Sequence, residues 1–132
     1  MGDFDGDGIA DLFLATGTSW FYSPAGNAEW RLLAGGRTDP IDSLLFGDFD
    51  GDGRTDVVGK NGATLMVSWG GISDWEVLNK QAPPLSDLSV GRFTSPHHDD
   101  LFWADGINWY VSQGGTGAFQ VQDVLAGGVR IM

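Results

Sequence analysis

The nine residues Asp3-Phe4-Asp5-Gly6-Asp7-Gly8-Ile9-Ala10-Asp11 recur 45 positions later as Asp48-Phe49-Asp50-Gly51-Asp52-Gly53-Arg54-Thr55-Asp56, with only two changes. The chain is therefore an internal repeat. A repeat of this length is typical of one four-stranded blade of a β-propeller. Each copy also places four aspartates within nine residues.

The repeat extends through the whole chain as three units, residues 2–46, 47–90 and 91–132, here called units 1, 2 and 3. In unit 3 the acidic loop is degenerate, since the segment from Arg92 to Asp100 keeps only Phe93 and the final aspartate. Three further positions are the same in all units: Gly17, Gly62 and Gly106; Ser23, Ser68 and Ser112; and Gly26, Gly71 and Gly115.

The glycine content argues against long helices. Glycine accounts for 21 of the 132 residues and separates short β-rich runs. Some runs, such as Leu65-Met66-Val67, are apolar without alternation and need cover on both faces, which stacked blades supply. We expect an all-β fold, a β-propeller of four-stranded blades. The strands expected in unit 2 are Leu44–Asp48, Thr55–Gly59, Thr64–Trp69 and Trp75–Leu78.

The first strand of the repeat is missing at the start of unit 1, where only Met1 precedes Gly2. Val129-Arg130-Ile131-Met132 has that place in the repeat register, so residues 129–132 are expected to complete the first blade of another chain. Propellers have about four to eight blades. Two chains would give a six-bladed ring, a head-to-tail homodimer. The alternative is a fragment of a longer propeller.

The acidic loops have the pattern of a hard-cation site. Carboxylates at positions one, three, five and nine supply oxygens, and a glycine permits the sharp bend. Without a cation, four acids this close would repel one another strongly. We expect two Ca²⁺ ions per chain, bound by Asp3, Asp5, Asp7, the Ile9 carbonyl and Asp11, and by Asp48, Asp50, Asp52, the Arg54 carbonyl and Asp56.

Other interpretations of these loops are weaker. An EF-hand needs a glutamate at position twelve, where the chain has Leu14 and Gly59. Magnesium prefers a stiff octahedron with several waters. The remaining alternative is that each loop is an aspartate-rich turn that binds no metal. The metal is expected to be structural, because no open metal position lies beside a candidate acid or base.

The composition limits the classes of binding partner and the cellular locations that we expect for this protein. The net charge is −11, and there is no basic cluster, which disfavours nucleic acid and anionic membranes. No apolar run is long enough to span a membrane. Cysteine is absent, which excludes disulfides and thiol chemistry. We expect an extracellular, secreted protein that relies on metal instead, although the chain shows no signal peptide.

The sequence offers little for catalysis. It has no G-x-S-x-G elbow, no cysteine nucleophile and no phosphate-binding loop. Glycoside hydrolysis needs two facing carboxylates, and eight of the eighteen acids lie in the two intact loops. His97 and His98 are adjacent in the degenerate loop, which favours a plain loop over a metal site. We expect no enzyme activity.

The acidic segments Gly2–Asp11 and Gly47–Asp56, with the degenerate Gly91–Asp100, resemble the FG-GAP or VCBS repeat family. This resemblance implies an integrin-like β-propeller with calcium loops between the first and second strands of a blade. The rest of each unit is similar to the propeller lectins of fungi and bacteria of the Psathyrella velutina lectin type. That similarity implies sugar pockets between blades, with N-acetylglucosamine as the first guess.

Aromatic and polar side chains give candidates for such a pocket. A pyranose presents an apolar C–H face to an aromatic ring and hydroxyls to polar groups. The candidates, expected at the end opposite the acidic loops, are Trp20, Trp103 and Trp109, with Lys60, Asn61, Asp105 and Asn108. Core packing and solvated loops are the respective alternatives. Trp30 and Trp75 share one repeat position and are predicted to be blade core.

These features favour a calcium-stabilised, non-catalytic carbohydrate-binding lectin with pockets between blades. The alternatives are a protein-interaction or adhesion module, and a designed repeat scaffold without a ligand. Competition by free sugar separates the first two. The units differ most at Leu14, Gly59 and Trp103, which predicts pockets of unequal quality or fewer pockets than blades.

Overall fold

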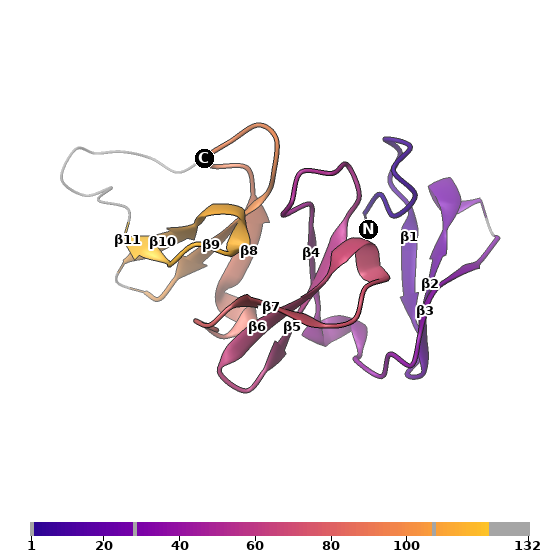
Figure 1. The fold of residues 1–132 in the computed structure, drawn as a ribbon, viewed down its shortest axis with the longest axis horizontal. Coiled ribbons are helices and arrows are strands. Elements are labelled where there is room, and N and C mark those ends of the chain that lie inside the picture. Colours follow the sequence, from indigo (N-terminus) through magenta and orange to yellow (C-terminus); the bar gives the residue numbers. More distant parts are fainter. Residues whose placement is uncertain (1, 28, 107, 122–132) are drawn as a thin grey trace.

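The chain forms three antiparallel β-sheets that lie side by side (Figure 1). A computed structural model describes residues 2–27, 29–106 and 108–121. Within those ranges there is no α-helix, and the turns include five short 3-10 segments. No helix there has the length and apolar character needed to cross a bilayer. The expected all-β class is confirmed.

Each sheet corresponds to one unit of the repeat, although the first strands of the second and third sheets begin at Leu45 and Leu88, shortly before the unit boundaries. Unit 1 has three strands, and units 2 and 3 have four each, in the order of the chain. The strands are β1 (Leu12–Ala15), β2 (Ser19–Ser23) and β3 (Arg31–Gly35); β4 (Leu45–Gly47), β5 (Asp56–Asn61), β6 (Thr64–Ser68) and β7 (Glu76–Asn79); and β8 (Leu88–Gly91), β9 (Asp100–Ala104), β10 (Trp109–Ser112) and β11 (Gln120–Val121). The four strands predicted in unit 2 are confirmed, with small shifts at their ends.

The described part of unit 1 has no strand before β1. Gly2 and Asp11 form an isolated bridge at the position where Gly47 pairs with Asp56. The register of the repeat is thus kept, but the pairing goes no further along this edge. Residues 129–132, expected to complete this blade from another chain, lie outside the described residues. The three sheets do not close into a ring, so the closed propeller remains a prediction.

The core lies between the sheets. Phe4, Trp20, Leu44 and Val57 form a cluster between units 1 and 2. A larger cluster between units 2 and 3 includes Val58. Val57 and Val58 are neighbours on β5, and both are fully buried, because each face of this strand is covered by a different unit. This explains why the strand lacks the alternation of a half-exposed sheet.

The two tryptophans predicted to be blade core differ in environment. Trp75 is half-buried and its ring stands edge-on to Trp20, at 5.5 Å between centroids. Trp30 is 45% exposed, so the core prediction for it is wrong. The reason is positional, because Trp75 has unit 1 beside it and Trp30 has no preceding unit in the described chain.

Candidate metal loops and a pocket between units

The first acidic loop curls around the carboxylate of Asp3. Its oxygens accept hydrogen bonds from the backbone N–H groups of Gly6 at 2.8 Å, Asp7 at 3.2 Å and Gly8 at 2.7 Å. Gly6 and Gly8 have φ values of 76° and 85°, which side-chain-bearing residues rarely adopt. The second loop repeats this arrangement around Asp48.

The last aspartate of each loop fastens the loop to the sheet. Asp56 is fully buried and accepts N–H bonds from Phe49 at 2.9 Å and Gly70 at 2.8 Å. Gly70 belongs to the 3-10 turn after β6, so one carboxylate joins two segments of unit 2. Asp11 does the same in unit 1, with the N–H groups of Phe4 and Ala25.

Three carboxylates meet in each loop. Asp3, Asp5 and Asp11 each place one oxygen within 4.8 Å of the others, and so do Asp48, Asp50 and Asp56. Oxygen donors alone, carried on a flexible loop, suit Ca²⁺ better than metals that prefer nitrogen or sulfur. These residues fit the expected ion.

The remaining predicted ligands behave differently. Asp7 lies outside its group of three and accepts the Ile9 N–H at 2.8 Å. Asp52 likewise accepts the Arg54 N–H at 2.8 Å. The two side chains close local turns in this structure, and the backbone carbonyls of Ile9 and Arg54 stay predicted ligands.

The electrostatics of the second loop favour a cation. Burial, with the neighbouring charges of Asp50 and Asp52, raises the pKa of Asp56 to about 7. Burial, with a hydrogen bond to Asp48, raises the pKa of Asp50 to about 6. A divalent cation would offset both the desolvation and the repulsion that disfavour these charges.

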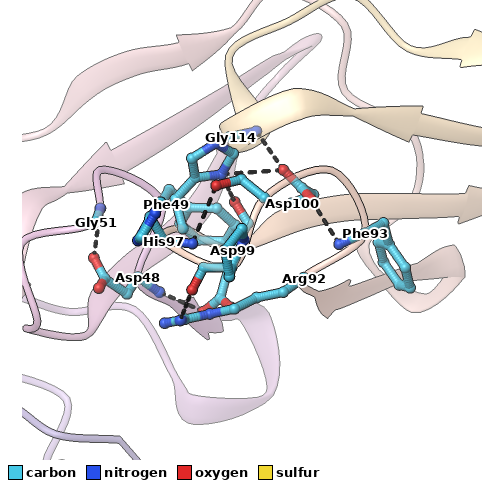
Figure 2. A network of polar contacts seen from close by, with 12 residues as sticks. Asp48, Phe49, Gly51, Arg92, Phe93, His97, Asp99, Asp100 and Gly114 are labelled. Carbon is cyan, nitrogen blue, oxygen red and sulfur yellow. Dashed lines mark hydrogen bonds and ion pairs between the residues drawn. The ribbon is translucent and has the colours of Figure 1, made fainter.

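The degenerate loop of unit 3 compensates its buried acid with side chains (Figure 2). By repeat register, Arg92 replaces the first aspartate and Thr94 the second. The Thr94 hydroxyl donates to Asp100 Oδ1 at 3.0 Å, and His98 Nδ1 lies 3.2 Å from the same oxygen. Arg92 Nε pairs with Asp99 at 3.0 Å. His97 is exposed, in keeping with a plain loop.

The pKa of Asp100 reflects this difference. Burial would raise it, but N–H bonds from Gly114, Phe93 and Thr94 outweigh burial and lower the pKa below its ordinary value. The corresponding Asp56 accepts two such bonds beside two further acids and shifts the other way. Unit 3 therefore stabilises its buried carboxylate without the acids that would attract a cation.

The loops of neighbouring units are joined by reciprocal hydrogen bonds. Asp3 N–H donates to Thr55 Oγ1, and Thr55 N–H donates to the Asp3 carbonyl, both at 2.8 Å. Asp48 and Asp99 make the same pair of contacts, both at 2.7 Å. All three loops consequently lie at one end of the molecule (Figure 1).

A pocket of about 250 Å³ lies between units 1 and 2. Part of it is formed by residues at the turn between β5 and β6, and this turn lies at the end of the molecule opposite the acidic loops (Figure 1). Two predicted sugar contacts, Lys60 and Asn61, line it. Its other lining residues were not predicted as contacts. They are Asp39, Gly59, Met66 and Trp75.

The Trp75 ring forms the aromatic wall of the pocket, and neighbouring residues fix its position. A Cβ on Gly59 would lie 3.0 Å from the Trp75 ring, so the glycine lets the ring approach the strand. The guanidinium of the buried Arg37 lies over both tryptophans, 5.6 Å from the Trp75 centroid and 5.0 Å from that of Trp20. Trp20 is fully buried and supports the wall without facing the pocket.

The other sugar candidates lie in unit 3, away from this pocket. Trp103 stacks on Tyr110 at 4.5 Å and stands edge-on to Phe119. Trp109 is 37% exposed. Asp105 accepts hydrogen bonds from the Tyr110 hydroxyl at 3.0 Å and from Asn108 N–H at 2.8 Å, so it closes a turn. The structure places two of the seven predicted residues, Lys60 and Asn61, in the pocket between units 1 and 2.

Comparison with known proteins supports the repeat. Residues 3–59 match the FG-GAP-like repeat family, a span that includes both acidic loops. No curated protein and no solved structure matches the chain. The resemblance to FG-GAP-like repeats is confirmed over residues 3–59, while the finer similarity to propeller lectins has no support among these comparisons.

Proposed function

We propose that this chain is a non-catalytic carbohydrate-binding module of the propeller-lectin type, stabilised by two Ca²⁺ ions, with its sugar pocket between units 1 and 2. The observation that carries the proposal is the lining of that pocket. The Trp75 ring forms one wall, and Asp39, Lys60 and Asn61 add a carboxylate, an ammonium and an amide. This is the combination of apolar face and hydrogen-bonding groups that a pyranose requires.

The pocket suits one small sugar. Its volume of about 250 Å³ lies just below the usual range for drug-sized ligands. Trp75 is fixed by Gly59, Trp20 and Arg37, so little side-chain entropy is lost when a ligand stacks on the ring. Met66 offers an apolar surface that could receive an acetamido methyl group, which keeps N-acetylglucosamine as the first candidate.

The residues that line the pocket favour binding of a sugar without its hydrolysis. Asp39 is the one carboxylate among the residues that line the pocket. Glycoside hydrolysis by the usual routes needs two. The acidic loops lie at the other end of the molecule (Figure 1). The proposed calcium ions therefore stabilise the fold and do not contact the sugar.

Assembly and location complete the proposal. A head-to-tail homodimer would form a six-bladed ring and cover the sheet edges left open in one chain. An extracellular location suits calcium-dependent folding, because extracellular modules can use sites of modest affinity.

The alternative function is adhesion to a protein. It is favoured by the large apolar side chains exposed on units 1 and 3, among them Leu12, Phe93 and Trp109. Free sugar would compete with a glycan ligand and leave a protein ligand bound. A designed scaffold would bind neither.

A glycan array in calcium buffer tests the proposal. The wild type is expected to bind a coherent set of glycans that free monosaccharide displaces. Trp75→Ala should abolish binding, because it removes the aromatic wall. Trp30→Ala is the matched control at the same repeat position, outside the pocket, and should bind normally. A blank array from folded wild type, or unchanged binding by Trp75→Ala, would overturn the proposal.

A further inference from the structure

Consecutive units contact each other through the same apolar arrangement twice. At the first contact Leu33 of unit 1 lies over Gly71 of unit 2, where a Cβ would be 2.6 Å from Leu33 Cδ2 and 3.4 Å from Val57 Cγ2. At the second contact Leu78 lies over Gly115 in the same way, with Leu101 beside it. Val57 and Leu101 share one repeat position and are fully buried. In both contacts, a leucine of one unit therefore packs against a glycine and a fully buried strand residue of the next unit.

A polar contact accompanies each apolar one. Arg37 Nη2 of unit 1 donates to Ser68 Oγ at 3.4 Å and to the Ser73 carbonyl. Asn79 Nδ2 of unit 2 donates to Ser112 Oγ at 3.2 Å. Both serines are fully buried at one repeat position. Each receiving unit therefore presents a buried serine hydroxyl to an N–H group from the preceding unit.

Unit 1 presents the receiving half of this contact, with no preceding unit among the described residues. Leu12, the counterpart of Val57 and Leu101, is 40% exposed where they are fully buried. Ser23, the counterpart of Ser68, is fully buried, yet its Oγ has no hydrogen-bond partner among the described residues. A buried hydroxyl without a partner is costly and therefore rare.

Unit 3 presents the opposite half. Phe93 is 42% exposed, while its counterparts Phe4 and Phe49 are 3% and 4% exposed. Trp109 is 37% exposed, while its counterpart Trp20 is fully buried. The Phe102 ring lies between them, 5.7 Å from Phe93 and 6.0 Å from Trp109.

The contact that this face lacks is visible in unit 1. There Phe13, the counterpart of Phe102, packs at 4.9 Å against Phe46, which lies on β4, the first strand of the next sheet. Phe4, the counterpart of Phe93, reaches the same ring at 6.2 Å. The aromatic face of unit 3 is thus the surface onto which a following unit packs, with no following unit among the described residues.

We infer that these two faces bind each other between two copies of the chain, with unit 3 of each copy packed against unit 1 of the other. By repeat register, the exposed residues of the two faces occupy positions of a contact that the chain already makes twice, although unit 3 has Gln122 where Leu33 and Leu78 stand. A head-to-tail contact of this kind closes when the rotation between copies completes a ring. The inference rests on the proposed homodimer and gives it a contact surface, separate from the sugar pocket, which lies within one chain.

Sedimentation equilibrium in calcium buffer tests the surface. The wild type should show twice the 14.1 kDa mass of one chain. Leu12→Lys should sediment as a monomer, because it places a charge in the contact. Val77→Lys is the matched control, an exposed strand residue outside the repeated contact, and should stay dimeric. Thermal melts establish that both variants are folded.

Ser23→Ala tests the polar part of the contact. Removing a hydroxyl that has no partner among the described residues should cost the monomer less than Ser68→Ala costs it, but weaken the dimer roughly tenfold, since a dimer contains the contact twice. Ser68→Ala is the control, because its hydroxyl is bonded inside the chain. It should lower the melting temperature and keep the dimer.

A monomeric wild type, a Leu12→Lys variant that dimerises like the wild type, or a mass that rises without limit would each overturn the inference. Sugar binding is read separately, since a monomeric Leu12→Lys chain keeps the pocket between units 1 and 2. Loss of glycan binding with an intact dimer would therefore contradict the lectin proposal alone.

Discussion

Trp103 occupies in unit 3 the repeat position that Gly59 occupies in unit 2. A pocket lies beside Gly59, whereas the Trp103 side chain fills the corresponding space in unit 3. Gly59 lines the 250 Å³ pocket under Trp75. Trp103 instead stacks on Tyr110, the counterpart of Met66, and abuts Phe119, the counterpart of Trp75. Unit 3 thus fills with its own side chain the space that corresponds to the pocket of unit 2, where we propose that a sugar binds.

This relationship predicts the effect of Gly59→Trp. The new ring would occupy the pocket and displace Trp75, whose ring lies 3.0 Å from the Cβ position. Glycan binding should fall below detection by calorimetry, while circular dichroism shows a folded β-protein. Retained affinity would mean that the sugar binds elsewhere.

Removing calcium should lower the melting temperature. A ligand that binds only the folded state stabilises it by about 2.7 kcal/mol per site when present at a hundred times its dissociation constant. Calorimetry with excess chelator, with Ca²⁺ and with Mg²⁺ measures the effect. We expect a large gain in melting temperature from Ca²⁺ and a small one from Mg²⁺. Identical melts in calcium and in chelator would contradict the metal sites.

Asp50→Ala separates a metal site from an aspartate-rich turn. Asp50 is exposed and its raised pKa shows that its charge is disfavoured without a cation. In chelator, the variant should be as stable as the wild type or slightly more so, within the roughly 0.5 kcal/mol typical of surface changes. In calcium it should lose most of the stabilisation from the second loop. A loss of equal size in both buffers would support the plain turn. Asp42→Ala, in an exposed turn, serves as the control.

The pH dependence of the metal-free protein follows from Asp56. Its folded-state pKa is about 7, above the ordinary value of 3.8, so the folded chain binds this proton more tightly than the unfolded chain. Metal-free stability should therefore rise as pH falls from 8 to 5 and be lost again as pH rises through about 7. The gain from calcium should shrink over the same range, because protons compete with the ion.

Urea unfolding in chelator at several pH values measures this dependence. Asp56→Asn should remove the larger part of it, and Asp50, whose pKa is raised to about 6, should account for the remainder. The lowered pKa of Asp100 acts only at more acidic pH and does not interfere. Metal-free stability that falls between pH 8 and pH 6 would contradict the assignment.

The strands could be predicted from local sequence because a strand that is buried on both faces has apolar side chains at adjacent positions. Val57 and Val58 are both apolar, and each faces a different neighbouring unit. Trp30 and Trp75 were not distinguished by local sequence. They share a repeat position, but among the described residues only Trp75 has a preceding unit beside it. Exposure at the two ends of a repeat array depends on the neighbour, which no local pattern contains.

The candidate sites were predictable to different degrees. The carboxylates of Asp3, Asp5 and Asp11 lie within one short loop, so their proximity follows from the chain. The pocket joins Asp39 of unit 1 to Lys60 and Trp75 of unit 2, and its shape depends on how two sheets pack. Trp20 was predicted as a sugar contact from its residue type, but it is fully buried and Arg37 lies over its ring. Nothing in the sequence around Arg37 indicated that its side chain would cover Trp20.

The most direct test of the lectin proposal is an NMR titration of ¹⁵N-labelled, calcium-loaded protein with N-acetylglucosamine and the best glycans from the array. We expect shifts of the Lys60 and Asn61 amide signals and of the Trp75 indole signal, with little change at Trp30 or Trp109. An absence of shifts with every glycan tested, or shifts confined to other residues, would contradict the proposal.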